Sequence, residues 1–266
     1  MDRGSDRNAS GSRALGNSLE RRGASKGAPL SLFMEKKKVV FCTPSLAGPT
    51  APYIESLKAS LPLIEEAGWE HGYAQQIACQ YISAARSNML RSALDAKADT
   101  IVFLDYDVSW RPADLLKLLE TEGDVVAGTY RCKTEDGPTP EFYMGAWETN
   151  ADFTPKVRPS DGAISAKLIP AGFLKVTTHA VDEFMVAYPE LCYGPMWHLS
   201  IDLFNHGAKD RLWWGEDYAF SQRWRAKCGP IWLVPDLSID HHDKDKVYKG
   251  NLHEFLLRQP GGSKAA

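Results

Sequence analysis

The side chains of this 266-residue chain that can carry chemistry gather in short motifs. The strongest is the run 101–107, in which four apolar residues are followed by Asp105, Tyr106 and Asp107. Such a run predicts a buried strand, and open α/β sheets bind ligands beyond the carboxyl ends of their strands. Two carboxylates there repel each other unless a cation lies between them. The motif therefore indicates a Mg²⁺ or Mn²⁺ site that holds a diphosphate; solvated acids at a strand-to-helix turn are the alternative.

Basic side chains flank this motif. Arg86 lies beside the apolar stripe of a helix predicted over 81–96, where a guanidinium can contact a base or a phosphate. Arg131 and Lys133 follow a strand predicted over 124–128, where cations are placed to meet phosphate oxygens. The alternatives are a surface ion pair for Arg86 and a solvated loop for the other two.

A second acidic pair, Glu216 and Asp217, opens a helix predicted over 216–227. Acids at a helix start interact well with the helix dipole, and this role alone explains them. Asp217, however, shares a helical face with Phe220 and Trp224, so its carboxylate should point inward. A partly desolvated carboxylate is a candidate general base.

Two further candidate motifs carry aromatic or imidazole side chains. Trp213 and Trp214 directly precede the acidic pair and offer either a sugar-stacking platform or two core aromatics. His241, in the run Ser-Ile-Asp-His-His-Asp, follows a short predicted strand. Its imidazole can complete the ligands of the same cation, or it can be structural.

The elements that must position these side chains alternate between strand and helix. The first half predicts strands over 39–43, 72–78, 100–104 and 124–128, and helices over 53–67, 81–96 and 113–120. The second half predicts shorter strands over 141–147, 164–169 and 231–234 and one clear helix over 216–227. This order predicts an α/β fold with a mostly parallel central sheet flanked by helices and a mixed, aromatic-rich C-terminal half.

Composition indicates where the folded domain begins and ends, and charge indicates which class of partner is disfavoured. Residues 1–33 are rich in Ser, Gly and Arg and predict a disordered tail or an upstream extension, with a targeting peptide as the alternative. The folded domain is expected over 34–258, followed by a frayed end over 259–266. The chain beyond residue 33 carries 25 basic and 31 acidic groups, so nucleic acid is the least favoured partner.

Cysteine usage and hydropathy indicate where the protein works. The five cysteines include no C-x-x-C pair, which fits reduced thiols and a cytoplasmic location. No apolar run approaches the ~20 residues of a membrane helix, so no membrane span is expected.

The order of the motifs resembles that of GT-A-fold glycosyltransferases, near the family-two and Anp1-like groups. The resemblance runs from about Val39 to Leu256, and its specificity lies in the joint order of short motifs. The matching segments are Ala85-Arg86-Ser87-Asn88, Asp105-Tyr106-Asp107, Gly128-Thr129-Tyr130-Arg131-Cys132-Lys133, Ala171-Gly172-Phe173-Leu174 and Gly215-Glu216-Asp217. The late His motif departs from the family, because Asp243 stands where Gly is usual; His241 is the better register and His242 the alternative.

The resemblance implies a metal-dependent transfer of a hexosyl or pentosyl group from a UDP- or GDP-linked sugar to an acceptor hydroxyl. Asp105 would contact the ribose or a metal-bound water, and Asp107 and His241 would bind Mn²⁺ or Mg²⁺. Asp217 would be the general base of an inverting displacement, and Glu216 would orient acceptor or donor; the Anp1-like group retains configuration instead. The other implied donor-binding residues are Thr43, Pro44, Ser45, Arg86, Tyr106, Lys133 and Gly172.

The acceptor stays open between a glycan, a lipid-linked sugar, a protein side chain and a modified base. Two other functions fit parts of the pattern. The run from Leu104 to Val108 fits the opening motif of a haloacid-dehalogenase-type phosphatase with Asp105 as nucleophile, although two strand–helix units precede it here. A non-catalytic sugar-nucleotide-binding module is the third alternative.

Overall fold

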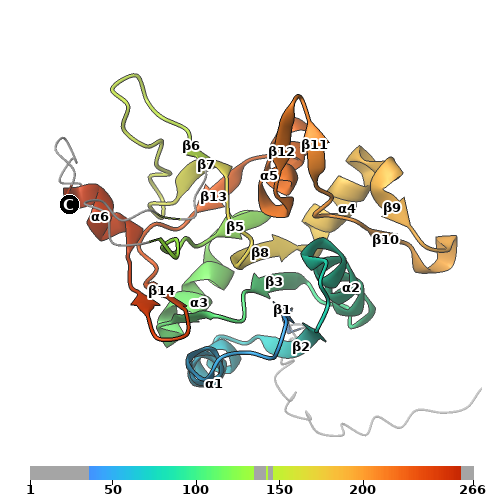
Figure 1. The fold of residues 1–266 in the computed structure, drawn as a ribbon, viewed down its shortest axis with the longest axis horizontal. Helices are drawn as coiled ribbons and strands as arrows, with labels where there is room; N and C mark the ends of the chain where they lie inside the picture. The colour runs from blue at the N-terminus through green and yellow to red at the C-terminus, as the bar shows by residue number, and fades with distance from the viewer. Residues whose placement is uncertain (1–35, 135–141, 143–145, 259–266) are drawn as a thin grey trace, which may run out of the picture. The chain divides into compact units, whose positions relative to one another are not determined.

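An eight-stranded sheet forms the centre of the structure, a computed structural model that describes residues 36–134, 142 and 146–258 (Figure 1). The strands, in spatial order, are β2 (Glu70–Ile77), β1 (Lys38–Ser45), β3 (Thr100–Leu104), β8 (Phe173–Thr177), β5 (Val125–Ala127), β13 (Ile231–Leu233), β7 (Ile164–Leu168) and β6 (Ala146–Trp147). β1 runs parallel to β2 and β3, and β5 runs parallel to β13, whereas β8 and β7 are antiparallel to their neighbours. The predicted fold class, an α/β fold with a mostly parallel central sheet flanked by helices, is confirmed.

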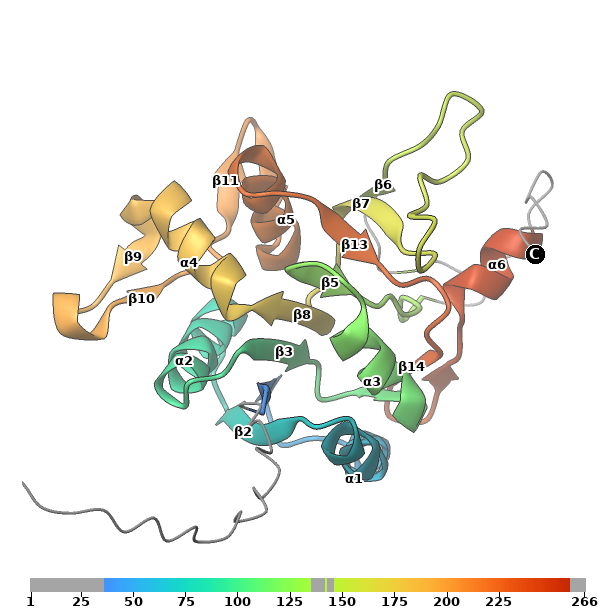
Figure 2. The same cartoon turned by 180° about the vertical axis from the view of Figure 1, so that it is seen from behind.

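Helices cover both faces of this sheet (Figures 1 and 2). On one face lie α2 (Ile82–Asp95), α4 (Thr178–Ala187) and α5 (Glu216–Lys227), and on the other lie α1 (Ala51–Glu66) and α3 (Pro112–Glu120). Side chains of a strand alternate between faces. In β1, Val40 and Cys42 accordingly join the core under α2, while Val39 and Phe41 join the core under α1.

Smaller elements form three further small sheets and short helices outside the central sheet. The remaining elements are β4 (Val108–Trp110), β9 (Cys192–Tyr193), β10 (Ser200–Ile201), β11 (Gly207–Lys209), β12 (Leu212–Trp214), β14 (Ile239–His242), β15 (Val247–Tyr248), α6 (Leu252–Arg258) and the 3₁₀ turns Pro189–Leu191 and Met196–His198. β4, β14 and β15 form a three-stranded sheet in which His241 pairs with Val108. This pairing brings the late histidines beside the Asp105–Asp107 turn.

The first half follows the predicted elements closely, with two differences: β4 was not predicted, and the first strand does not end before Pro44. That proline was expected to close the first strand, but β1 continues through it to Ser45. Only Val39–Cys42 pair with β3, so the missing N–H of Pro44 falls where the β3 partner has already ended.

The second half holds more structure than the sequence indicates. The prediction of one clear helix there was wrong, because α4 and α6 are also present, and the central strand β8 was missed. His241 was expected after a short strand but lies within β14. The tail predicted over 1–33, the frayed end predicted over 259–266 and most of the strand predicted over 141–147 lie outside the described residues.

Two further observations concern thiols and hydropathy. Cys42, Cys79, Cys192 and Cys228 are free thiols. Among the described residues, no helix combines the length and the apolar character that crossing a membrane requires.

Candidate functional site

The carboxyl ends of β1, β3 and β5 meet at one edge of the sheet, together with the start of β8. Asp105 is the first residue after β3, and its backbone N–H donates to the carbonyl of Gly172 at 2.9 Å. Thr43 and Pro44 end β1 at the same edge, with Ser45. The sheet topology thus gathers the predicted residues because parallel strands present their ends together.

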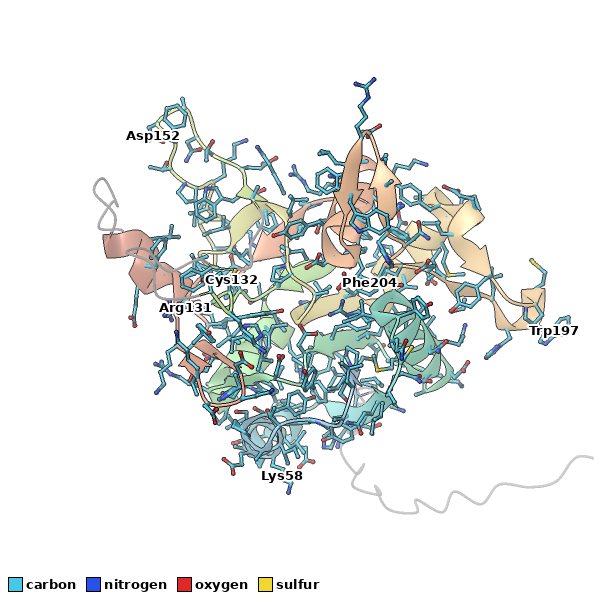
Figure 3. The ribbon with its side chains drawn as sticks, in the orientation of Figure 1. Lys58, Arg131, Cys132, Asp152, Trp197 and Phe204 are labelled. Atoms are coloured by element: carbon cyan, nitrogen blue, oxygen red, sulfur yellow. The ribbon has the colours of Figure 1, made fainter. Side chains whose placement is uncertain are left out.

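Arg86 joins the two acidic motifs, which lie far apart in sequence. Its side chain is only 2% exposed. Nη2 donates to Asp105 Oδ1 at 2.9 Å, and Nη1 donates to Glu216 Oε1 at 2.5 Å. The guanidinium also lies 5.3 Å from the ring centroid of Phe204, which Figure 3 shows beside α2. A buried cation of this kind is tolerated only when it is paired, so Arg86 connects the start of α5 to the end of β3.

Asp105 is held on both of its carboxylate oxygens. Oδ1 accepts from Arg86, and Oδ2 accepts from the Tyr130 hydroxyl at 3.0 Å. Burial raises the pKa of Tyr130 well above its ordinary value, so its hydroxyl stays a donor. A nucleophilic aspartate needs an oxygen that faces the substrate. Because both oxygens of Asp105 already accept hydrogen bonds, the structure disfavours the phosphatase alternative, in which Asp105 attacks a phosphate group.

Gly172 is required by close packing at this point. A Cβ on Gly172 would overlap the Tyr130 hydroxyl and would lie 2.6 Å from Asp105 Cγ. Only glycine therefore allows the β8 start to approach Asp105 closely enough for the backbone hydrogen bond. The sequence analysis assigned Gly172 to donor binding, and the structure gives it a packing role beside Asp105.

Asp107 is surrounded by basic groups. Lys133 Nζ donates to Asp107 Oδ2 at 2.5 Å, and His241 Nε2 lies 3.4 Å from the same oxygen. Burial opposes ionisation of this carboxylate, but the hydrogen bonds from His241 and Lys133 outweigh it and lower the pKa of Asp107. Asp107 is therefore ionised at neutral pH.

The tautomer of His241 bears on metal binding. Its Nδ1 lies 2.8 Å from the carbonyl oxygen of Arg131, which can only accept. A hydrogen bond from His241 to Asp107 therefore requires the doubly protonated imidazolium. When the imidazole is neutral, its proton is on Nδ1 and the lone pair of Nε2 points toward Asp107. Two facing acceptors favour a cation between them, and a backbone carbonyl behind a histidine is a frequent second partner of metal ligands.

The three predicted metal ligands are brought together only in part. Asp107 and His241 face each other, whereas Asp105 is held by Arg86 and Tyr130. In the part of the chain that the structure describes, no group of three acidic, His or Cys side chains converges on one point. The donor set that fits a hard cation is therefore one carboxylate and one imidazole, and the Lys133 ammonium shares that carboxylate.

Asp217 lies at the start of α5 in an environment that favours its protonated form. Burial is the largest cause and the neighbouring Glu216 adds to it, and together they raise the pKa of Asp217 to about 6 although Arg86 opposes them. Phe220 and Trp224 on the same face are both buried, as predicted. One oxygen accepts from the backbone N–H of Tyr218 at 2.7 Å. A carboxylate with a near-neutral pKa suits proton transfer.

The first loop is tied to the acidic turn by the backbone. Thr50, which caps α1, donates from its N–H to the Tyr106 carbonyl at 3.0 Å and from its hydroxyl at 3.1 Å. Thr43 shares a hydrogen bond with the buried hydroxyl of Tyr53. The Ser45 hydroxyl is buried and has no hydrogen-bond partner among the described residues. It is therefore a donor that a ligand at this edge can satisfy.

The sequence analysis did not predict the role of Tyr130 or the partners of Arg86. Tyr130 was quoted only as part of a motif, yet it holds Asp105, and its ring packs edge-on against His241 with centroids 5.0 Å apart. Arg86 was expected to meet a base or a phosphate, but its guanidinium is engaged with two carboxylates. The signal for Arg86 was its place beside an apolar helical stripe, which indicates burial.

Comparisons with known proteins give distant structural likenesses. No protein-family model matches the chain, and no curated protein sequence matches it. The fold is similar to A197 from STIV, with a TM-score of 0.47 and 17% identity over 81% of this chain and 94% of that one. It is also similar to S. aureus TarS 1–349, with a TM-score of 0.41 and 15% identity over 84% of this chain and 66% of that one.

A third likeness is to a glycosyltransferase involved in the glycosylation of the major capsid of PBCV-1. Its TM-score is 0.27 and its identity 13%, over 56% of this chain and 65% of that one. Likenesses this distant carry no functional conclusion, so the function of this chain rests on its own side chains.

Proposed function

We propose that this protein is a glycosyltransferase that moves a sugar from a nucleoside diphosphate-sugar to an acceptor hydroxyl. The observation that carries the proposal is the ion-pair bridge Asp105–Arg86–Glu216. Through it, the acidic turn after β3 and the acidic start of α5 belong to one site. The motif order that resembles GT-A glycosyltransferases supports the same function, since both motifs are the ones that the resemblance assigns to donor and acceptor.

On the donor side, Asp107 and His241 would hold Mn²⁺ or Mg²⁺. The bound cation would neutralise charge that develops on the leaving diphosphate. Lys133, now on Asp107, is a second cation that can meet a phosphate oxygen. Thr43, Pro44 and Ser45 would border the base.

On the acceptor side, Asp217 is the general base of an inverting transfer. Its raised pKa means that the carboxylate both ionises near neutral pH and takes up a proton readily. Glu216 is less suited to this role because its carboxylate is engaged by the Arg86 guanidinium. Glu216 instead positions the start of α5, and with it Asp217.

Calorimetry with UDP and with GDP, each with and without Mn²⁺, tests the donor side and identifies the base. We expect one nucleotide to bind and Mn²⁺ to strengthen its binding. Asp107→Ala should lose the Mn²⁺ effect, whereas Asp182→Ala, which removes an exposed carboxylate on α4, should keep it. Unchanged Mn²⁺-dependent binding in Asp107→Ala refutes the metal role.

Turnover separates an enzyme from a binding module. The protein should release UDP or GDP from the matching nucleotide-sugar in the presence of an acceptor, and Asp217→Asn should bind the donor but turn it over slowly. Binding without any transfer or hydrolysis would favour the non-catalytic module. A product of retained anomeric configuration would reject Asp217 as the base of an inverting reaction.

A further inference from the structure

A small pocket lies between the β11–β12 hairpin and α5, apart from the side chains of the carboxylate cluster. Its volume is about 110 Å³. The polar side chains that line it are Asn205, His206, Lys209, Trp214, Gln222 and Arg223. Figures 1 and 2 both show the hairpin lying along this helix. Nothing in the proposed transfer uses these side chains.

The hairpin register separates Lys209 and Trp214, which line the pocket, from Trp213, which does not. Gly207 pairs with Trp214, and Lys209 pairs with Leu212, so these four residues share one face of the hairpin. Ala208 pairs with Trp213 on the opposite face, and Trp213 is 73% exposed. Trp214 and Lys209 therefore turn toward α5, while Trp213 turns away.

The pocket is cationic. Lys209 and Arg223 both line it, and no carboxylate among the described residues does. Arg223 donates to the backbone carbonyl of Asn205 and to its side-chain oxygen, the latter at 3.0 Å. Both of these partners are neutral, so the guanidinium charge is oriented by Asn205 but is not compensated by it.

The pocket is also lined by a residue with a buried hydrogen-bond donor that lacks an acceptor. The indole N–H of Trp214 is shielded from solvent and has no hydrogen-bond partner within the described part of the chain. Indole nitrogen can only donate. Leaving such a donor buried and unsatisfied is unfavourable, so native structures seldom keep one without a ligand or water.

We propose that this pocket binds a single oxyanion, a phosphate or carboxylate group, which accepts from the Trp214 indole N–H and is neutralised by Lys209 and Arg223. The size agrees with this ligand class. A water molecule needs roughly 10–15 Å³, and pockets for whole small-molecule ligands usually measure about 300–1,000 Å³. The pocket therefore has room for one oxyanion with some water but not for a nucleotide-sugar. The inference does not depend on the proposed transfer reaction.

Titration of the full chain with inorganic phosphate, followed through the indole N–H signals in ¹H–¹⁵N NMR spectra, tests the pocket. The signal that disappears in Trp214→Phe identifies Trp214, and we expect that signal to shift saturably. Lys209→Met should weaken phosphate binding by up to about fivefold, the loss expected for one exposed charged contact. Trp214→Phe, followed by calorimetry, should weaken it similarly, because phenylalanine keeps a ring but removes the donor.

Matched controls come from the same chain. Trp213→Phe removes the indole on the other face of the hairpin, and Lys58→Met removes an exposed cation on α1, which Figure 3 shows at the far end of the molecule. Both should bind phosphate as the wild type does. A Trp214 signal that does not shift, or binding that survives both Lys209→Met and Trp214→Phe, overturns the proposal.

A second arm identifies the source of the anion. Dimethyl phosphate mimics a phosphodiester within a larger acceptor, acetate mimics a carboxylated sugar, and inorganic phosphate represents a free ion. Shifts of Trp214 with the diester or with acetate assign the pocket to a group carried by a larger molecule. A shift with inorganic phosphate alone assigns it to the free ion, and the oxyanion site stands in either case.

Discussion

Asp217→Asn should make the protein more stable while removing its activity. Burial and Glu216 raise the pKa of Asp217 from 3.8 to about 6, so the folded state binds this proton more tightly than the unfolded state does. Stability from this group is therefore lost as pH rises from about 4 to 6, and the full penalty is present above pH 6. At ~1.36 kcal/mol per pKa unit, the penalty at pH 7 is about 3 kcal/mol at most.

Asparagine removes the charge but keeps an oxygen that can accept from Tyr218. Urea unfolding at pH 7 should therefore show Asp217→Asn more stable by up to about 3 kcal/mol, and the gain should fall to about 1 kcal/mol near pH 4.5. Asp182→Asn, at an exposed site on α4, should show no comparable gain. Turnover should fall about 10²–10⁴-fold, since a general base is lost. A variant that is less stable at pH 7, or whose gain does not shrink with pH, would refute the desolvated environment.

Three further predictions follow from the contacts of the site. Arg86→Leu should cost about 3–5 kcal/mol of unfolding free energy, because it leaves Asp105 and Glu216 unpaired, and urea titration measures it; a loss below about 1 kcal/mol would contradict the buried bridge. Gly172→Ala should cost about 1–3 kcal/mol through overlap with Tyr130, while Gly229→Ala, which has space for a Cβ, should cost less. Wild-type turnover should rise with pH through about 6 as Asp217 ionises, and a flat profile between pH 5 and 7 would argue against Asp217 as base.

The parts of the fold that the sequence predicts best are those with a strong local signal. The strand over 100–104 and the helix over 216–227 have the predicted bounds. The first is an uninterrupted apolar run that stops at an acid, and the second starts after a glycine with two acids in its first turn. In both cases neighbouring residues alone contain the information.

The strand β8 was missed because its local sequence pattern does not predict a strand. Its apolar pattern is interrupted by Lys175, which is buried in the structure. Its ammonium donates to the carbonyl of Leu119 at 3.2 Å and also to that of Thr121, at the end of α3. These bonds let a buried lysine lie within a central strand, because the lysine satisfies carbonyls that the helix leaves open. Such a partner more than 50 positions away leaves no trace in the local pattern.

The same reasoning explains what could be predicted of the site. Asp105, Asp107 and Asp217 could be named as candidate site residues because acids at strand ends and helix starts are visible in the sequence. The Arg86 bridge was not, because its partners lie 19 and 130 positions away. Only the sheet topology places these three segments together, and charge pairing between them cannot be inferred from composition.

Charge separation between the two sites supports the functions proposed for them. The cluster at the strand ends holds four carboxylates, Asp105, Asp107, Glu216 and Asp217, and the cations that pair with them are Arg86 and Lys133. With Asp217 ionised, this excess of negative charge repels a diphosphate unless a further cation is bound. The pocket behind α5 has the opposite character, with Lys209 and Arg223 and no acid among its described lining. A metal-assisted donor therefore fits the first site and a bare oxyanion the second, and neither ligand suits the other's surroundings.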